Sequence, residues 1–299
     1  MDRHRRPHHS GPVPPVPPDP PVPPRPPVPP VPPVPPDSPP APTSPVALRV
    51  LEIADDPDAW RAAGFTVGSG PPPRVRLGGV EVVLTGSGGR PADERGVTGV
   101  GITGIDADLD GLPRCDHAPA SPGPDHAGHE RPDAGHAVRH PNGVRRLDHI
   151  VLVTPDCDRT TAAFVAAGLE VRRVRRIPAG DATRRQTFFW LGDVIAELVG
   201  DDSAHGAGPT RVWGLALTVA DIEHTAAVLG DALGPVRPAV QPGRRIATLR
   251  TRELGISTAI AVMSPHRPGG AGPVGGQDPG AGGAGPADGQ EGGAGGAGR

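Results

Sequence analysis

The chain has 299 residues, a formal net charge of −3, and 44 residues each of glycine and proline. A charge this close to neutral excludes the strong attraction to nucleic acids or anionic membranes that a basic chain would have, so we expect neither as a partner. All cationic side chains are arginine, because the sequence contains no lysine, and it contains no tyrosine either. Schiff-base chemistry on lysine and general acid catalysis by tyrosine are therefore excluded.

Cys115 and Cys157 are the only cysteines, too few to predict a disulfide framework or a cysteine-rich zinc site. The N-terminal sequence MDRHRRPHHS is charged but is followed by proline, so it does not have the apolar segment of a secretory signal. No apolar run approaches the ~20 residues of a membrane span. We expect a soluble, cytoplasmic protein.

The first predicted segment, residues 1–45, is dominated by proline and repeats the motif VPP. Such a sequence favours an extended polyproline II conformation without internal hydrogen bonds, and it carries too little apolar surface to form a core. We predict a disordered segment. It could serve as a docking site for proline-recognition domains, but a low-complexity spacer is the favoured interpretation.

Residues 46–110 predict a partial, degenerate copy of a βαβββ unit. We expect a strand in VALRVLEIA at 46–54, a helix over 57–63, and three strands in FTV at 65–67, RVRLGG at 74–79 and VEVVLTG at 80–86. One further strand, VTGVGITGID at 97–106, has no second helix after it.

Residues 111–145 predict a flexible linker rich in histidine, proline and glycine. Its histidines and neighbouring acids are His117, His126, His129, His136, His140, Asp125 and Glu130. A metal-binding tract is one interpretation. A linker with scattered histidines is favoured, because the spacing follows no regular ligand pattern.

Residues 146–265 predict a complete α+β domain with two tandem βαβββ units. In the first unit, a strand at 146–153 precedes a helix that Asp156 caps and that runs to Ala167, and three strands follow within 169–177, 184–192 and 193–200. In the second unit, a strand at 212–219 precedes a helix that begins at Asp221 and ends at Gly234, and strands follow within 234–240, 245–251 and 257–263. Residues 266–299 predict a disordered, glycine-rich tail.

Repeated motifs support this duplication. AAGFTV at 62–67 matches AAGLEV at 166–171, and VTGVGITGID at 97–106 matches VWGLALTVAD at 212–221. The second copy, through LDHIVLVTPD at 147–156, IAELVG at 195–200 and ALTVAD at 216–221, resembles the glyoxalase, bleomycin-resistance and vicinal-oxygen-chelate superfamily. The resemblance implies a curled mixed sheet whose tandem units enclose a cup, but it does not specify an activity.

The same resemblance implies a divalent metal ion, with ligands from the first and last strand of each unit. In the first unit these positions hold His149 and Glu197, which we predict as ligands of one zinc, manganese, iron or nickel ion. In the second unit, Gly214 and Val262 occupy the matching positions and supply no ligand. A third ligand would have to come from His205, His266, Glu253 or the second subunit of a homodimer, and the sequence selects none of these.

The His149–Glu197 pair has three interpretations: a hydrogen-bonded remnant of a metal site, a weakened or partner-completed metal site, or a metal-free acid and base. Two functions correspond to them. One is a metal-dependent lyase, isomerase or dioxygenase, and the other is a metal-free protein that sequesters a small molecule, as bleomycin-resistance proteins do.

Side chains around the pair are also ambiguous. The arginines of RRVRR at 172–176, together with Arg184 and Arg185, could hold an anion or could protect an exposed strand edge. Phe188 and Trp190 could line a cavity or pack in the core.

Overall fold

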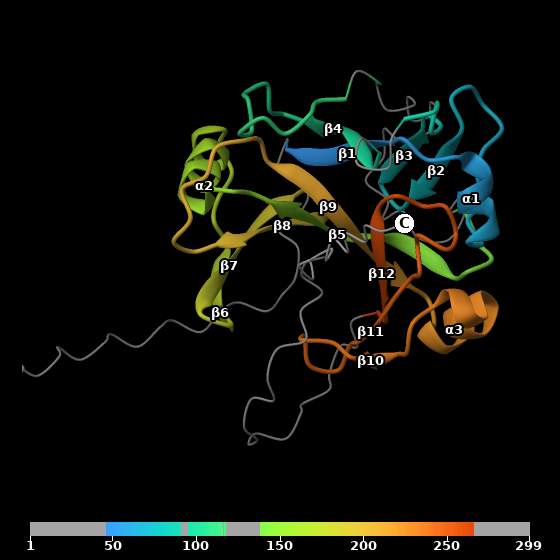
Figure 1. Cartoon of the computed structure of the whole chain (residues 1–299). Coiled ribbons are helices and arrows are strands. Elements are labelled where there is room, and N and C mark those ends of the chain that lie inside the picture. Colours follow the sequence, from blue (N-terminus) through green and yellow to red (C-terminus); the bar gives the residue numbers. More distant parts are fainter. Residues whose placement is uncertain (1–45, 91–94, 116, 118–137, 266–299) are drawn as a thin grey trace, which may run out of the picture. The chain divides into compact units, whose positions relative to one another are not determined.

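The computed structural model describes residues 46–90, 95–115, 117 and 138–265 (Figure 1). These residues lie within one compact unit of the chain. The proline-rich segment, the glycine-rich tail and most of the predicted linker lie outside the described residues. Within the described ranges, every helix is too short or too polar to cross a membrane.

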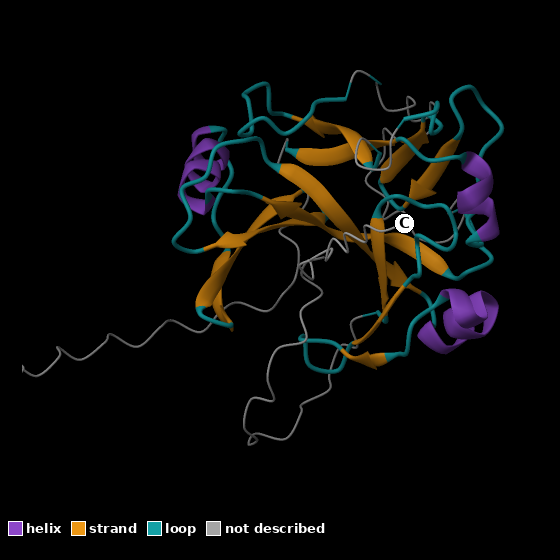
Figure 2. Cartoon of the chain, in the orientation of Figure 1, coloured by secondary structure: helices purple, strands orange, loops and turns teal. Residues whose placement is uncertain are grey.

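The described elements form two sheets (Figure 2). The four-stranded sheet has the order β2-β3-β1-β4, and its elements are β1 (Ala47–Ile53), α1 (Pro57–Ala62), β2 (Arg74–Leu77), β3 (Val80–Leu84) and β4 (Val97–Thr103). The eight-stranded sheet has the order β10-β11-β12-β9-β5-β8-β7-β6. Its elements are β5 (Val144–Val153), α2 (Cys157–Ala166), β6 (Arg173–Ala179), β7 (Ala182–Leu191), β8 (Val194–Asp201), β9 (Arg211–Val219), α3 (Ile222–Leu229), a 3₁₀ turn (Gly230–Ala232), β10 (Arg237–Pro238), β11 (Arg245–Thr248) and β12 (Ala259–Met263).

The eight-stranded sheet confirms the predicted duplication. Each half has the order strand, helix and three strands, and in each half the first strand pairs in parallel with the last: β5 with β8, and β9 with β12. The two first strands, β5 and β9, pair antiparallel at the centre of the sheet. The sheet is mixed and curls strongly (Figure 1), as the resemblance implies.

Aspartates start the two helices of this sheet, as predicted. The Asp156 side chain accepts a hydrogen bond from the Arg159 backbone amide, and the Asp221 side chain caps α3 in the same way. After α2, Gly168 has φ of 90°, a conformation that favours glycine. The predicted end of α3 at Gly234 is wrong. The helix ends at Gly230, whose φ of 51° takes the chain out of the α conformation four residues earlier.

The first sheet is smaller than predicted, because residues 65–67 do not form a strand. Phe65 instead packs its ring against Trp60, with ring centroids 4.9 Å apart. The Thr66 amide donates to Nδ1 of His140, 3.0 Å away, so this backbone is hydrogen-bonded outside any sheet. The N-terminal elements are therefore βαββ followed by β4. Whether they are a degenerate copy of the later units stays a prediction.

The two sheets share one hydrophobic core. Residues 138–143, at the end of the predicted linker, pack against the first sheet. His140 is buried and lies within 2.9 Å of the Arg76 carbonyl oxygen, and the Asn142 side-chain amide donates to the Ala63 carbonyl. Burial lowers the pKa of His140, which favours the neutral ring.

Candidate functional site

One face of the eight-stranded sheet is more open than the other. Along β5, His149, Val151 and Val153 are half-buried, whereas the alternating Ile150 and Leu152 are fully buried. Cross-strand pairing carries this open face across the sheet, because directly paired residues point to the same side. Val151 pairs with Glu197 on β8, so the open face holds both predicted ligands.

The structure brings His149 and Glu197 together. His149 Nε2 and Glu197 Oε2 are 3.7 Å apart, and each side chain is 15% exposed. This separation is too long for a hydrogen bond. It is close to the roughly 3.0–3.5 Å between neighbouring ligands that ligand–metal bonds of 2.0–2.2 Å would produce.

His149 is held by its other ring nitrogen. Nδ1 lies 3.0 Å from Oδ2 of Asp148. A proton on Nδ1 directed at this carboxylate leaves the Nε2 lone pair facing Glu197, the arrangement that carboxylates commonly impose on metal-binding histidines. The sequence analysis did not identify Asp148, although its place beside His149 in a buried strand was a signal.

Asp148 is fixed by a buried ion pair. Its Oδ1 lies 2.9 Å from Nη2 of Arg244 and accepts a hydrogen bond of 2.9 Å from the Thr218 hydroxyl. Burial acts to raise the pKa of Asp148, but hydrogen bonds from His149 and Arg244 outweigh it and hold the pKa well below its ordinary range. Asp148 therefore stays ionised and can orient the imidazole.

Glu197 has a different environment. Burial raises its pKa, and electrostatic attraction by the neighbouring His149 and Arg175 side chains offsets this only in part. Its Oε1 accepts a hydrogen bond of 2.6 Å from the Gln186 side-chain amide. A carboxyl group whose pKa is raised by burial holds its proton more strongly than an exposed one, and it can bind a cation in place of that proton.

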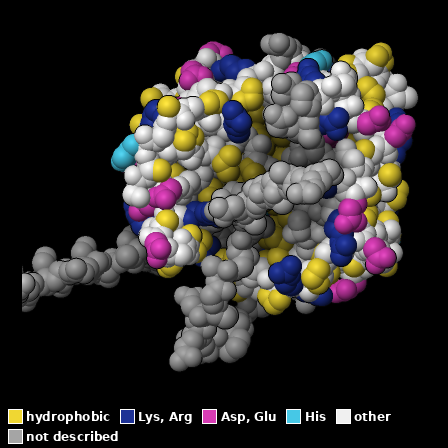
Figure 3. Space-filling model, viewed as in Figure 1, with side chains coloured by type: hydrophobic (Ala, Val, Ile, Leu, Met, Phe, Trp, Pro, Cys, Tyr) yellow, Lys and Arg dark blue, Asp and Glu magenta, His cyan; other side chains and the backbone are white. Residues whose placement is uncertain are grey.

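Apolar and cationic side chains surround the pair. Phe188 pairs with Glu197, and Trp190 with Ile195, so both half-buried rings lie on the open face. Arg173 and Arg175 pair with Phe188 and Gln186, which places them on that face too. Figure 3 shows hydrophobic side chains toward the middle of one face of the molecule and charged side chains toward its rim.

Two other arginines of the cluster, Arg176 and Arg185, pair with each other across β6 and β7 and point to the face opposite the open one. β6 is an edge strand, and Arg176 forms an ion pair with Asp202 at 2.6 Å. Arg185 forms a second ion pair with Asp158, also at 2.6 Å. Because Asp158 lies in α2, the second pair links β7 to that helix and leaves Arg185 unavailable to an anion on the open face.

The second half of the sheet supplies no ligand at the matching positions. Gly214 corresponds to His149, as predicted. The predicted counterpart of Glu197, Val262, is wrong by one residue: Val262 is buried and pairs with Leu217, on the opposite face. The counterpart is Ala261, which pairs with Ala216 as Glu197 pairs with Val151. A one-residue shift in register moves a side chain to the other face, and sequence alignment alone did not detect it.

The structure brings neither of two proposed third ligands to the pair. His205 lies 3.5 Å from Asp156 at the start of α2, and Glu253 lies 3.5 Å from Arg250 in an exposed turn. His266 lies outside the described residues. In the described part of the chain, only Glu52, Cys115 and His117 form a group of three possible metal ligands, and this group belongs to the first sheet.

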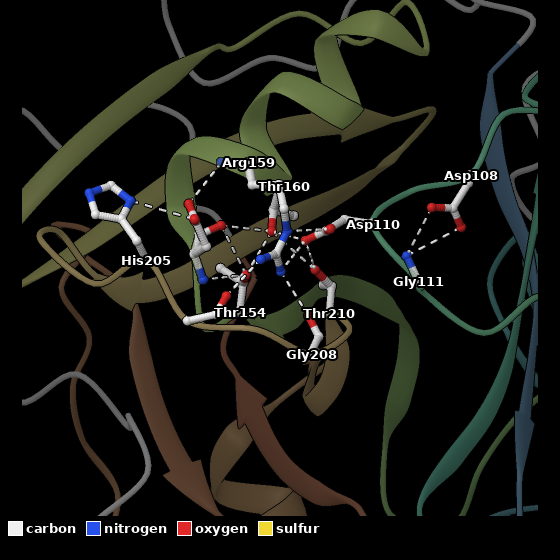
Figure 4. Close-up of polar contacts among 11 residues, drawn as sticks. Asp108, Asp110, Gly111, Thr154, Arg159, Thr160, His205, Gly208 and Thr210 are labelled. Atoms are coloured by element: carbon white, nitrogen blue, oxygen red, sulfur yellow. Dashed lines mark hydrogen bonds and ion pairs between the residues drawn. The ribbon is translucent and has the colours of Figure 1, made fainter.

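Figure 4 shows a polar network that joins the segment after β4 to the first half of the eight-stranded sheet. Asp110 accepts hydrogen bonds from Nε of Arg159 at 2.7 Å, from Thr210 at 3.1 Å, and from the Thr160 hydroxyl. Burial acts to raise the pKa of Asp110, but these donors outweigh it and lower the pKa. The donors lie in α2 and directly before β9, so the network connects Asp110 to the eight-stranded sheet. The sequence analysis missed it, because its members are about 50 to 100 residues apart.

Comparisons with known proteins support the fold. No protein-family model and no curated protein sequence matches the chain. Among solved structures, a variant of 4-hydroxymandelate synthase from Streptomyces coelicolor is similar over 74% of this chain and 93% of that chain, with 15% identity and a TM-score of 0.51. Methylmalonyl-CoA epimerase from Mycobacterium tuberculosis is similar over 42% and 91%, with 18% identity and a TM-score of 0.33.

The synthase similarity carries the comparison, because it covers 74% of this chain and almost the whole of the other protein. At 15% identity it concerns the fold alone. Together with the duplicated strand order, it confirms the fold that the resemblance implied. The chain has the glyoxalase-like fold of the vicinal-oxygen-chelate superfamily.

Proposed function

We propose that the open face of the eight-stranded sheet binds a small organic molecule next to a divalent metal ion held by His149 and Glu197. The observation that carries this proposal is the pair itself: a histidine with Nδ1 directed at a carboxylate, and a second carboxylate 3.7 Å from its free Nε2. Two donor atoms that face each other at this distance can share a cation, either a proton or a metal ion.

The donor set fits a metal ion but does not complete its coordination. Imidazole and carboxylate ligands suit zinc, manganese, iron and nickel alike. With two protein ligands, the other positions fall to water, to the small molecule or to a second copy of the chain. Such a metal polarises oxygen atoms of a bound molecule, which is the chemistry of lyases, isomerases and dioxygenases of this kind.

The protein's own groups would each have a defined task. Asp148 and Arg244 would keep the imidazole in one orientation. Phe188 and Trp190 would contact apolar parts of the small molecule, and Arg175 would attract an anionic group. Glu197, if not bound to metal, would accept or release a proton.

A metal-free binding protein is the alternative, and it too has a specific observation in its favour. Gly214 and Ala261 replace both ligands of the second half. Neither residue has a side-chain donor, so the coordination of a metal ion would rest on the first half alone. In this alternative, the proton of Glu197 takes the place of the metal, and the cup holds an apolar or aromatic molecule.

Metal analysis of the purified full chain tests the two functions. We expect the wild type to bind zinc or manganese. The one equivalent of metal bound between His149 and Glu197 should be lost in both His149→Ala and Glu197→Ala. His205→Ala, which removes an exposed histidine paired with Asp156, is the matched control and should retain the metal. Unchanged metal binding in His149→Ala would exclude the metal-dependent function. Binding of small carboxylic acids that persists with a chelator and in both variants would support the alternative.

A further inference from the structure

Three side chains with metal-binding donors meet on the first sheet. Glu52 lies on β1, and Cys115 and His117 lie in the segment after β4. Cys115 Sγ is 3.0 Å from Glu52 Oε1, and His117 Nδ1 contacts the same oxygen. One donor atom from each residue lies within 4.8 Å of the other two.

Backbone contacts fix Cys115 in this position. The Cys115 amide donates to the Val100 carbonyl at 3.2 Å, and the Val100 amide donates to the Pro113 carbonyl at 2.9 Å. Between them, the Arg114 guanidinium donates to the carbonyl oxygens of Ile105 and Ala107. The segment is therefore attached along the edge of the first sheet, and Cys115 does not depend on its side-chain contact for its place.

Two glycines of β4 make room for the cluster. A Cβ atom at Gly99 would lie 2.7 Å from Glu52 Oε2 and 3.1 Å from Cys115 Cα. A Cβ atom at Gly101 would lie 3.1 Å from Val50 Cβ and 3.6 Å from Cys115 Cβ. Neither glycine has a positive φ, so it is the neighbouring atoms, and not the backbone conformation, that favour glycine here.

We propose that Glu52, Cys115 and His117 form a second metal site that binds Zn²⁺, separate from the His149–Glu197 pair. A thiolate, an imidazole and a carboxylate are the three ligand types of protein zinc sites. The thiolate disfavours magnesium and calcium, which take oxygen ligands. The Glu52 side chain is 14% exposed and that of His117 is 37% exposed, so the ion can enter and water can take the fourth position.

Binding at this site has a simple proton balance. The Cys115 thiol loses its proton to solvent as the sulfur–zinc bond forms, and the neutral His117 ring coordinates through Nδ1 with its proton on Nε2. Glu52 exchanges its hydrogen bonds with Cys115 and His117 for a bond to the metal. Nothing is oxidised or reduced. The bound ion would hold Cys115 and His117 against Glu52 of β1 in place of these hydrogen bonds.

Cobalt substitution gives the sharpest test, because a thiolate ligand to Co²⁺ produces a charge-transfer band in the near ultraviolet that nitrogen and oxygen ligands do not. The reduced full chain, stripped with a chelator and titrated with Co²⁺, should develop this band and lose it when Zn²⁺ is added. Cys115→Ser should abolish the band. Cys157→Ser is the matched control, since Cys157 is the only other cysteine and is buried at the start of α2.

Two further variants keep the proposal falsifiable. His117→Ala changes a partly exposed side chain with little risk to folding, and it should weaken Co²⁺ binding at least about tenfold. The double variant His149→Ala and Glu197→Ala should keep the band, which separates this site from the proposed function. Absence of the band in the wild type, its persistence in Cys115→Ser, or unchanged affinity in His117→Ala would overturn the proposal.

Discussion

The two halves of the eight-stranded sheet share a strand order but not a chemistry. In the first half, the open face carries His149, Glu197 and two aromatic rings. In the second half, the matching positions carry Gly214 and Ala261. The backbone pairing that builds the cup therefore needs both halves, whereas the candidate ligands on its open face lie in the first half, and the second half contributes Arg244 and Thr218, which hold Asp148. Fold and site are specified by different residues, and changes that affect one half more than the other will distinguish them.

The largest effect should come from the ion pair that connects the halves. Asp148 belongs to β5, Arg244 precedes β11, and their side chains are 6% and 7% exposed. Asp148→Asn leaves a buried guanidinium without its counter-charge, so we expect the free energy of unfolding to fall by about 3–5 kcal/mol. Chemical denaturation measures this loss. The double variant Asp148→Leu and Arg244→Met removes both charges and should regain most of it. A double variant as unstable as the single one would contradict this account.

The next largest losses of stability should come from the contacts of the first sheet, and they should differ between its contact with the first half and its contact with the second half. Asp110 contacts Arg159 of the first half, whereas Asp55 accepts hydrogen bonds from the amide and hydroxyl of Ser257, near β12. Asp110→Asn should cost about 1.5–3 kcal/mol because its partner is charged, and Asp55→Asn about 1 kcal/mol because its partners are neutral. Urea denaturation of the two variants gives the comparison.

The Asp110 variant should also change the response to acid. Because the folded chain lowers the pKa of Asp110, its contribution is fully present above the ordinary carboxyl pKa of 3.8 and is lost as pH falls below it. The difference in stability between wild type and Asp110→Asn should therefore shrink at low pH. A difference that stays constant from neutral to acidic pH would exclude an ionised Asp110 as its source.

A carboxylate introduced into the second half should give that half a metal ligand like the one in the first half. Ala261→Glu places a carboxylate at the counterpart of Glu197, on the open face. A third protein ligand should tighten Zn²⁺ binding at least about tenfold, which is about 1.4 kcal/mol. Calorimetric titration with Zn²⁺ measures this affinity. Each variant should also carry Cys115→Ser, so that binding at the second proposed site does not contribute. Val262→Glu, one residue away on the buried face, should destabilise the fold without tightening binding.

The smallest effect concerns Glu197 itself. Burial raises its pKa, so the folded chain binds this proton more strongly than the unfolded chain does. Stability therefore falls as pH rises from the ordinary pKa of 4.5 through the raised value. In the presence of a chelator, Glu197→Gln should be slightly more stable than wild type at neutral pH and not at pH 4. A variant that is less stable at neutral pH would show that the ionised carboxylate stabilises the fold.

Local patterns were sufficient to predict most of the eight-stranded sheet. The repeated strand–helix junctions at Asp156 and Asp221 give the same caps in both halves, and apolar alternation gives the strands. The resemblance placed His149 and Glu197 on the first and last strands of one unit, and the structure brings them together, whereas their role as metal ligands stays a prediction. Residues 65–67 were misassigned because Phe65 packs on Trp60 and the Thr66 amide bonds to His140, which a local pattern does not contain.

The partners of the site could not be predicted, because they are distant in sequence. Arg244 contacts Asp148 across 96 residues, and Cys115 contacts Glu52 across 63. No periodicity relates such positions. The absence of a side chain at Gly99 points to the Glu52–Cys115–His117 cluster only once its spatial neighbours are known. Sequence patterns thus describe each strand, whereas the chemistry depends on which strands become neighbours.

The hydrogen bonds between Asp55 and Ser257 span 202 residues. During synthesis at about 5–20 residues per second, Asp55 leaves the ribosome roughly 10–40 seconds before Ser257 is available. During that interval the first sheet does not have its hydrogen bonds to Ser257, and its apolar face is not covered by a complete second sheet. The order of synthesis therefore makes the nascent N-terminal sheet the part of this protein most in need of protection from aggregation.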